Sequence, residues 1–266
     1  MTNAHKSVAI PRPAATVVIL RDGGEGIEVF MVVRHHEIDF ASGALVFPGG
    51  KVDEQDADPA WVQFAPSTAA APDRAFMVAA ARETFEEAGL VLARRRGAEP
   101  LLDAEAAHRL VERYRAPLLA GETTFLDLVR NEDLLLAPDL MVPFAHWITP
   151  ESQPKRFDTH FLLVSAPVEQ LGAHDGSESV EGFWIAPKQA LQDAEAGSRT
   201  LVLPTQMNLT KLARYATVAE AVAVTRLTRI VTVTPRVERT ADGRKLHIPA
   251  EAGYGVTEVL VPMPKR

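Results

Sequence analysis

Short apolar runs and turn-forming residues alternate along the first part of the chain. Residues 14–20 are apolar and rich in β-branched side chains, residues 21–26 contain Gly and Asp, and residues 27–33 are apolar again. Two such runs around a polar turn predict a β-hairpin. Residues 44–47 predict another short strand, which ends at Pro48-Gly49-Gly50, where we expect a tight turn.

The pattern becomes helical after Pro72. Asp73 suits an N-cap, an Ala-rich stretch follows, and Gly89 suits the C-terminal stop. On this helix an acidic group is spaced i, i+3, i+4 and therefore clusters roughly opposite the apolar face; it comprises Glu83, Glu86 and Glu87. The preceding residues 57–72 are rich in Pro and polar side chains, which predicts a surface loop outside the core.

The same periodicities predict the remaining elements. We expect helices over 103–119, 124–131, 187–194 and 204–223, strands over 146–148, 159–165 and 183–185, and a terminal hairpin of 230–237 and 245–248. The hairpin turn is Ala241-Asp242-Gly243. We divide the chain into a main domain (1–224) with a helical insertion at about 93–135, and a C-terminal β-hairpin extension (225–266).

Composition narrows the classes of function. With 266 residues, 47% of them hydrophobic, the chain can bury an ordinary core, and its apolar runs are shorter than the roughly 20 residues that span a bilayer. The first residues have no apolar stretch typical of a secretion signal, so we expect a cytoplasmic protein without membrane contact. A net charge of −7 argues against nucleic acid as a partner and leaves small anionic molecules open.

The acidic cluster suggests a metal site. Three like charges at helical spacing repel one another, so the helix loses stability unless a cation lies among them. Because the chain has no cysteine, oxygen or histidine ligands must hold any metal, and Mg²⁺ prefers carboxylate oxygens. The alternative is a solvated acidic face of the helix.

At this point the chain resembles the Nudix superfamily, whose box reads G-x5-E-x7-R-E-U-x-E-E-x-G-U, where U is aliphatic. The matching positions are Gly50, Arg82, Glu83, Glu86, Glu87, Gly89 and Leu90. Two positions depart from the pattern. Thr84 stands at a U position, and Asp56 stands where the first Glu belongs, with 25 residues rather than seven before Arg82.

The split box is similar to that of the coenzyme A diphosphatase branch, where an insertion falls in the same place. Residues 43–47, 147–150, 156–159 and 203–206 add to this resemblance, which covers roughly residues 14–224. The resemblance implies an α/β Nudix fold, with a mixed β-sheet sandwiched between α-helices. It also implies hydrolysis of a diphosphate bonded to another group, with Mg²⁺ or Mn²⁺ as cofactor.

The resemblance further implies roles for individual residues. The metal ligands would be Glu83, Glu86 and Glu87, and Arg82 would hold Glu86 in place; the alternative for Arg82 is a surface ion pair contributing under about 1 kcal/mol. Glu178 would be a further catalytic acid, although an exposed loop Glu is an equal alternative. The substrate-binding candidates are Arg34, Arg156, Gly49 and Gly50, and His35, His36 and His160 are further groups that could contact substrate.

Three functions stay open. The first is hydrolysis of coenzyme A or its acyl esters, and the second is hydrolysis of dinucleotides, ADP-ribose or nucleotide sugars. The third is a catalytically inactive Nudix-like module that binds nucleotides, against which the intact Glu86-Glu87 pair argues. The chain ends in Met263-Pro264-Lys265-Arg266, unlike a peroxisomal Ser-Lys-Leu tail. A homodimer formed through the C-terminal hairpin is left open.

Overall fold

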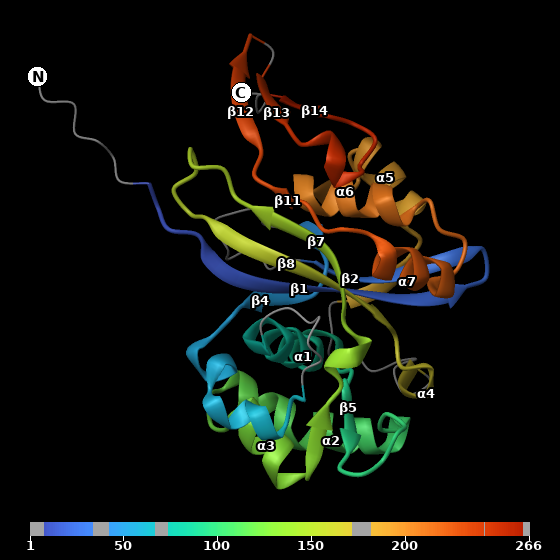
Figure 1. The fold of residues 1–266 in the computed structure, drawn as a ribbon. Coiled ribbons are helices and arrows are strands. Elements are labelled where there is room, and N and C mark those ends of the chain that lie inside the picture. Colours follow the sequence, from blue (N-terminus) through green and yellow to red (C-terminus); the bar gives the residue numbers. More distant parts are fainter. Residues whose placement is uncertain (1–7, 34–42, 67–73, 172–181, 242, 263–266) are drawn as a thin grey trace, which may run out of the picture.

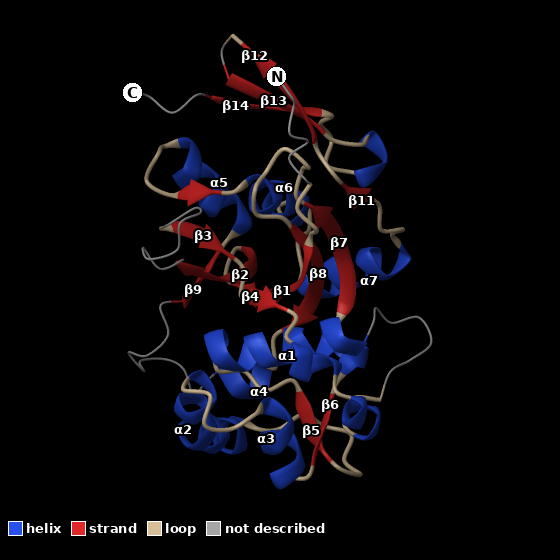
Figure 2. Cartoon of the chain, turned by 90° about the vertical axis from the view of Figure 1, so that its left-hand side faces the viewer, coloured by secondary structure: helices blue, strands red, loops and turns tan. Residues whose placement is uncertain are grey.

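A mixed β-sheet lies between two layers of helices in the computed structural model, which describes residues 8–33, 43–66, 74–171, 182–241 and 243–262 (Figure 1). Figure 2 shows α1 with α2, α3 and α4 on one side of the sheet, and α5 and α6 on the other. The helices are α1 (Arg74–Ala88), α2 (Ala104–Leu119), α3 (Phe125–Asn131), α4 (Val168–Leu171), α5 (Pro187–Glu195), α6 (Leu203–Leu212) and α7 (Val218–Leu227). The predicted α/β sandwich is therefore confirmed.

The main sheet has nine strands, seven of which follow the order β10-β3-β2-β1-β8-β7-β11, while β4 pairs with β1 and β9 pairs with β2. Its strands are β1 (Arg12–Gly23), β2 (Gly26–Val33), β3 (Ala44–Val46), β4 (Gly49–Lys51), β7 (Val142–Ile148), β8 (Phe157–Ser165), β9 (Gly182–Ile185), β10 (Thr200–Leu201) and β11 (Thr232–Val233). Strands β1 and β8 run parallel, whereas β1 and β2 form the predicted antiparallel hairpin.

Strand β1 explains why the sheet has two hydrophobic cores. Val17 and Ile19 face the core beside α1, whereas Val18 and Leu20 face the core beside α5 and α6. Because successive side chains of a strand point to opposite faces, a strand covered on both sides is apolar throughout. The continuous apolar run in this part of the sequence reflects that double burial.

The helical insertion lies on the far side of α1 from the sheet (Figure 1). Its helices α2 and α3 lie where the sequence predicts them. The side chains of Asp103 and Thr124 cap them by accepting hydrogen bonds from the backbone N–H groups of Ala106 and Asp127. A small two-stranded sheet of β5 (Ala93–Arg95) and β6 (Leu134–Leu136) closes the insertion. The sequence analysis did not predict these strands, each only three residues long.

The segment 57–66 is not a loop outside the core, as the sequence analysis expected. The 3₁₀-helix η1 (Glu54–Ala57) ends at the start of this segment and a second one, η2 (Pro59–Gln63), lies within it. Trp61 and Ala65 are each 1% exposed in the core beside α1. The indole of Trp61 also donates to the carbonyl of Gln55 at 2.9 Å. The Pro and polar residues of the segment predicted a surface loop, although Trp61 and Ala65 are packed in the core. Residues 67–73, which include the predicted N-cap Asp73, lie outside the described residues.

The predicted single helix over 204–223 is two helices, α6 and α7. The break lies before Thr217, whose hydroxyl accepts a hydrogen bond from the backbone N–H of Glu220 and caps α7. The Glu220 carboxylate in turn accepts from the backbone N–H of Ala216. These paired contacts start a new helix without a Gly or Pro, which is why the expected continuous helix was wrong.

The C-terminal region forms its own three-stranded antiparallel sheet (Figure 1). Strands β12 (Arg236–Thr240) and β13 (Gly243–His247) make the expected hairpin, but its first strand lies at 236–240 rather than over 230–237. Strand β14 (Glu258–Pro262) adds a third strand that was not predicted. The boundary placed at residue 224 falls within α7, and β11 still belongs to the main sheet. Among the described residues, no helix has both the length and the apolar character needed to cross a membrane.

Candidate active site

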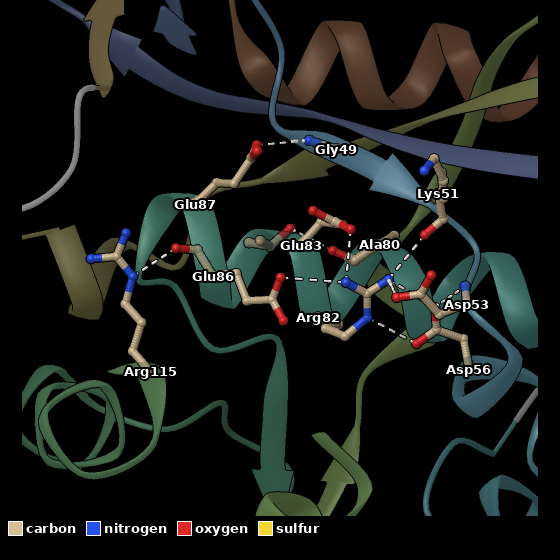
Figure 3. Close-up of polar contacts among 11 residues, drawn as sticks. Gly49, Lys51, Asp53, Asp56, Ala80, Arg82, Glu83, Glu86, Glu87 and Arg115 are labelled. Carbon is tan, nitrogen blue, oxygen red and sulfur yellow. Dashed lines mark hydrogen bonds and ion pairs between the residues drawn. The ribbon is translucent and has the colours of Figure 1, made fainter. Parts of the chain in front are cut away.

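Helix α1 presents its acidic residues to the first strands of the sheet and to η1 (Figure 3). Glu87 points toward β4, where its Oε2 accepts a hydrogen bond from the backbone N–H of Gly49 at 2.9 Å. Glu83 and Glu86 both contact the guanidinium of Arg82. The C-terminal half of the helix thus carries three carboxylates, two of which share Arg82 while the third accepts from Gly49.

Arg82 is the centre of this group and is only 4% exposed. Its Nε and Nη2 donate to Asp56 at 3.0 and 2.8 Å, and its Nη1 donates to Glu83 at 2.7 Å and to Glu86 at 3.3 Å. Its Nη2 also donates to the carbonyl of Lys51 at 3.0 Å. Burial disfavours its charge, but the hydrogen bond to Asp56 and the surrounding carboxylates raise its pKa above the ordinary value. The alternative of a surface ion pair is therefore wrong.

Asp56 is the partner that the sequence analysis noted without giving it a role. It is 2% exposed on η1, and its Oδ2 also accepts from the backbone N–H of Asp53 at 2.8 Å. The 25 residues that separate Asp56 from Arg82 fold back so that the two side chains meet. Its position at the first acidic place of the box was the signal that could have identified this contact.

Burial and like charge strongly affect the carboxylates of α1. The pKa of Glu83 is raised to about 7, first by burial and then by the charges of Glu87 and Glu86, while Arg82 opposes the shift. The pKa of Glu86 is also raised, chiefly by burial. Carboxylates whose pKa values are raised by burial and by neighbouring like charges are candidates for a functional site.

The two glycines do not form the tight turn that the sequence analysis expected. Gly49 and Gly50 belong to β4, which pairs antiparallel with β1 through Thr16 and Ala15. A Cβ at Gly49, whose φ is +154°, would collide with the carbonyl of Ala15, and a Cβ at Gly50 would collide with the Glu83 carboxylate. Glycine is needed here for close approach of backbone to backbone and of backbone to carboxylate.

Comparison with known protein families identifies the family to which this arrangement of carboxylates and Arg82 belongs. The profile of the NUDT19 Nudix domain matches residues 67–212, more than half of the chain, and this range includes Arg82 and the three glutamates. The chain belongs to the Nudix family. The resemblance based on the split box is thereby confirmed, although Asp56 and the two glycines lie before the matched range.

Curated Nudix relatives extend the similarity over about 70% of the chain. A nudix hydrolase of Caenorhabditis elegans is 30% identical over 186 residues, which cover 70% of this chain and 56% of the relative. The human protein named acyl-coenzyme A diphosphatase NUDT19 is 26% identical over 239 residues, covering 74% of this chain and 63% of the relative. The chain thus spans less than two thirds of the length of these relatives.

A solved Nudix structure supports the same fold. The crystal structure of a NUDIX hydrolase from Alicyclobacillus acidocaldarius aligns with a TM-score of 0.60 and 27% identity. The alignment covers 82% of this chain and 97% of that protein. Most of the Nudix neighbour is therefore present in this chain.

The structure does not bring all predicted residues to α1. Arg34 and Glu178, together with His35 and His36, lie outside the described residues. Arg156 is 8% exposed and donates to the backbone carbonyls of Thr149 at 2.9 Å and Ala9 at 2.8 Å. These contacts fasten the start of the chain to the turn between β7 and β8.

Proposed function

We propose that this Nudix chain hydrolyses a diphosphate linkage and that a divalent cation, Mg²⁺ or Mn²⁺, is held by Glu83, Glu86 and Glu87. The observation that carries the proposal is the convergence of these carboxylates on one half of α1 beside Gly49 and Arg82. Hard oxygen ligands are what Mg²⁺ requires, and Mn²⁺ accepts the same set.

The excess of carboxylates in the cluster supports the proposal that it binds a divalent cation. The carboxylates that contact Arg82 are Asp53, Asp56, Glu83 and Glu86. A second guanidinium beside them belongs to Arg115, which donates to the backbone carbonyl of Glu86. Among these described side chains, carboxylates outnumber guanidinium groups even before Glu87 is added. A pure binding module would have no need of such a repulsive cluster.

The residues around the cluster orient it. Arg82 ties Glu83 and Glu86 to Asp56, and the N–H of Gly49 fixes the Glu87 carboxylate. A divalent ion in such a site polarises phosphate oxygens and lowers the pKa of bound water. The proton of the attacking water would pass to one of these carboxylates or to Glu178.

For the substrate we propose coenzyme A or an acyl-coenzyme A, cleaved to 3′,5′-ADP and a phosphopantetheine product. The support is the position of the split in the box and the similarity to relatives named acyl-coenzyme A diphosphatase. The 3′-phosphate needs a cation of its own. Basic residues that could supply it are Arg34, Lys51, Lys155 and Arg156. Because the Arg156 guanidinium is bonded to backbone carbonyls, we favour Lys51, which is exposed on β4 and whose own carbonyl accepts from Arg82.

A substrate panel tests the proposal. Purified protein with Mg²⁺ or Mn²⁺ is given coenzyme A, dephospho-coenzyme A, ADP-ribose and a dinucleotide, and the products are resolved by mass. We expect no turnover in EDTA and coenzyme A to be hydrolysed roughly 10-fold to 100-fold faster than dephospho-coenzyme A, the value of one charge-assisted contact. Lys51→Met should reduce that preference, whereas Lys188→Met on α5 should not.

Each other result contradicts part of the proposal. Equal rates on the two coenzyme forms, or faster turnover of ADP-ribose or dinucleotides, would remove coenzyme A and leave the hydrolase. No product from any of these substrates with either metal ion would favour the inactive nucleotide-binding module.

A further inference from the structure

Two histidines and an aspartate meet on the sheet face that α1 covers, apart from the glutamates. His146 on β7 and His160 on β8 are direct partners in the antiparallel pairing of these strands. Asp158 lies two residues before His160 and therefore projects from the same face. Partner residues in an antiparallel sheet hold their Cβ atoms about 5 Å apart, which brings all three side chains together.

Their ligand atoms converge. The Nε2 of His146 lies 2.5 Å from the Asp158 Oδ1, and the Nε2 of His160 lies 3.9 Å from the same oxygen. The imidazole centroids are 4.1 Å apart, and one ligand atom from each residue lies within 4.8 Å of the others. The 2.5 Å contact is a hydrogen bond, which an ion bound to His146 would replace. The 3.9 Å separation is too long for a hydrogen bond and suits two bonds of about 2.0–2.2 Å to a shared ion.

Neighbouring residues orient both imidazoles. The Nδ1 of His146 lies 2.8 Å from the hydroxyl of Thr232 on β11, which turns Nε2 toward Asp158. The ring of Phe76, in the first turn of α1, packs 4.2 Å from the His160 ring between centroids. A hydrogen bond to the second ring nitrogen is the usual support of a metal-bound histidine.

We propose that His146, Asp158 and His160 bind a first-row transition metal ion, for which Zn²⁺ is the reference. Two imidazole nitrogens and one carboxylate oxygen are a typical ligand set for Zn²⁺, and less suitable for Mg²⁺. The three side chains are 17%, 34% and 30% exposed, so solvent reaches the group and water can complete the coordination. The ion would join β7 to β8 and, through Thr232, brace β11.

This site is distinct from the carboxylates of α1. Across the sheet, Gly50 pairs with Ala15, and Ala15 pairs with His160. Two strand spacings of about 4.8 Å therefore separate the backbone of His160 from that of Gly50, which Glu83 approaches. Nitrogen ligands at one place and oxygen ligands alone at the other allow the two sites to be measured separately.

The test is a Zn²⁺ titration of the full chain in excess Mg²⁺, which occupies the carboxylate site. We expect one Zn²⁺ per chain and a higher unfolding temperature, because the ion binds only the folded state. Thr232→Val should weaken Zn²⁺ binding about 10-fold to 100-fold, as expected when a group orienting a ligand is lost. His160→Ala should weaken it further, and His247→Ala, a histidine beside Glu238 and Glu258 on the C-terminal sheet, should not change it.

Glu86→Gln separates this proposal from the proposed function, because it should abolish hydrolysis and leave Zn²⁺ binding unchanged. Unchanged Zn²⁺ binding in His160→Ala, its loss in Glu86→Gln, or no binding by the wild type would overturn the proposal. If a histidine variant fails to fold, Co²⁺ bound to the wild type decides: paramagnetically shifted imidazole N–H signals from two histidines support the site, and their absence contradicts it.

Discussion

Arg82 on α1 and Arg94 on β5 each donate two hydrogen bonds to an aspartate, yet the surroundings of the two arginines differ. Arg94 donates to both oxygens of Asp139 at 2.7 Å, slightly shorter than the contacts of Arg82 with Asp56. The side chains of Arg82 and Asp56 are 5% and 1% exposed, whereas those of Arg94 and Asp139 are 21% and 47% exposed. The two arginine–aspartate pairs therefore differ in burial rather than in the length of their hydrogen bonds.

The two pairs also differ in their other partners. Arg82 shares its guanidinium with Glu83 and Glu86, so one cation serves several buried carboxylates. Arg94 has Asp139 and the carbonyl of Glu99. A balanced surface pair is a structural feature, whereas an unbalanced buried group keeps negative charge in place at a cost in stability. That cost is what makes α1 a candidate for function.

The largest expected effect is on catalysis. Glu86→Gln keeps the shape of the side chain but removes one charge of the proposed metal site, so we expect hydrolysis to fall about 100-fold to 10,000-fold. Steady-state rates at saturating Mg²⁺ measure this, with exposed Glu112→Gln on α2 as the control. Equal rates for Glu86→Gln and wild type would show that the unbalanced charge of α1 does not serve catalysis.

The next effect concerns stability. Asp56→Ala leaves the Arg82 guanidinium buried without its two hydrogen bonds to Asp56, and breaking a buried pair in this way costs about 3–5 kcal/mol. Urea unfolding of wild type and variant gives the difference. The control is Asp53→Ala, since the Asp53 carboxylate is 52% exposed and 3.6 Å from Arg82. A similar small loss in both variants would mean that burial does not distinguish the network.

The sequence predicted that the glutamates of α1 lie together with Arg82, but it did not predict the contact of Arg82 with Asp56. Arg82 and the glutamates lie within six residues on one helix, so helical periodicity alone places them together. Asp56 meets Arg82 across an intervening segment in which Trp61 and Ala65 are buried in the core. Local sequence patterns carry no information on such a long-range contact. The Pro and polar residues of this segment predicted a surface loop instead.

The fold shows the same contrast between elements set by neighbouring residues and elements set by residues far apart in the sequence. The β1–β2 hairpin and the positions of α2 and α3 follow from neighbouring residues and were predicted. The two-residue strands β10 and β11 exist through pairing with β3 and β7, which lie far away in the sequence. Likewise, the convergence of His146 with Asp158 and His160 depends on strand register, which the sequence analysis did not address.

A smaller effect is expected at the strand beside α1. Gly50→Ala places a Cβ against the Glu83 carboxylate, which must shift, and such overpacking costs typically about 1–3 kcal/mol. Mg²⁺ affinity should fall as well, because Glu83 is displaced. Gly24→Ala is a matched control, since its Cβ would meet nothing within 4 Å. If Gly50→Ala binds Mg²⁺ as wild type does, β4 does not position Glu83.

The smallest effect is expected at the surface pair, for which a double-mutant cycle with Arg94→Ala and Asp139→Ala should give a coupling of about 0.2–1 kcal/mol at neutral pH. Hydrolysis should not change. The hydrogen bond and charge of Arg94 lower the pKa of Asp139 in the folded state, so the coupling is present above the unfolded pKa of about 3.9 and disappears as the pH falls through the lower folded value. Unfolding measured at neutral and at acidic pH checks this sign. A coupling as large as the loss in Asp56→Ala would show that geometry, rather than burial, sets the strength of both pairs.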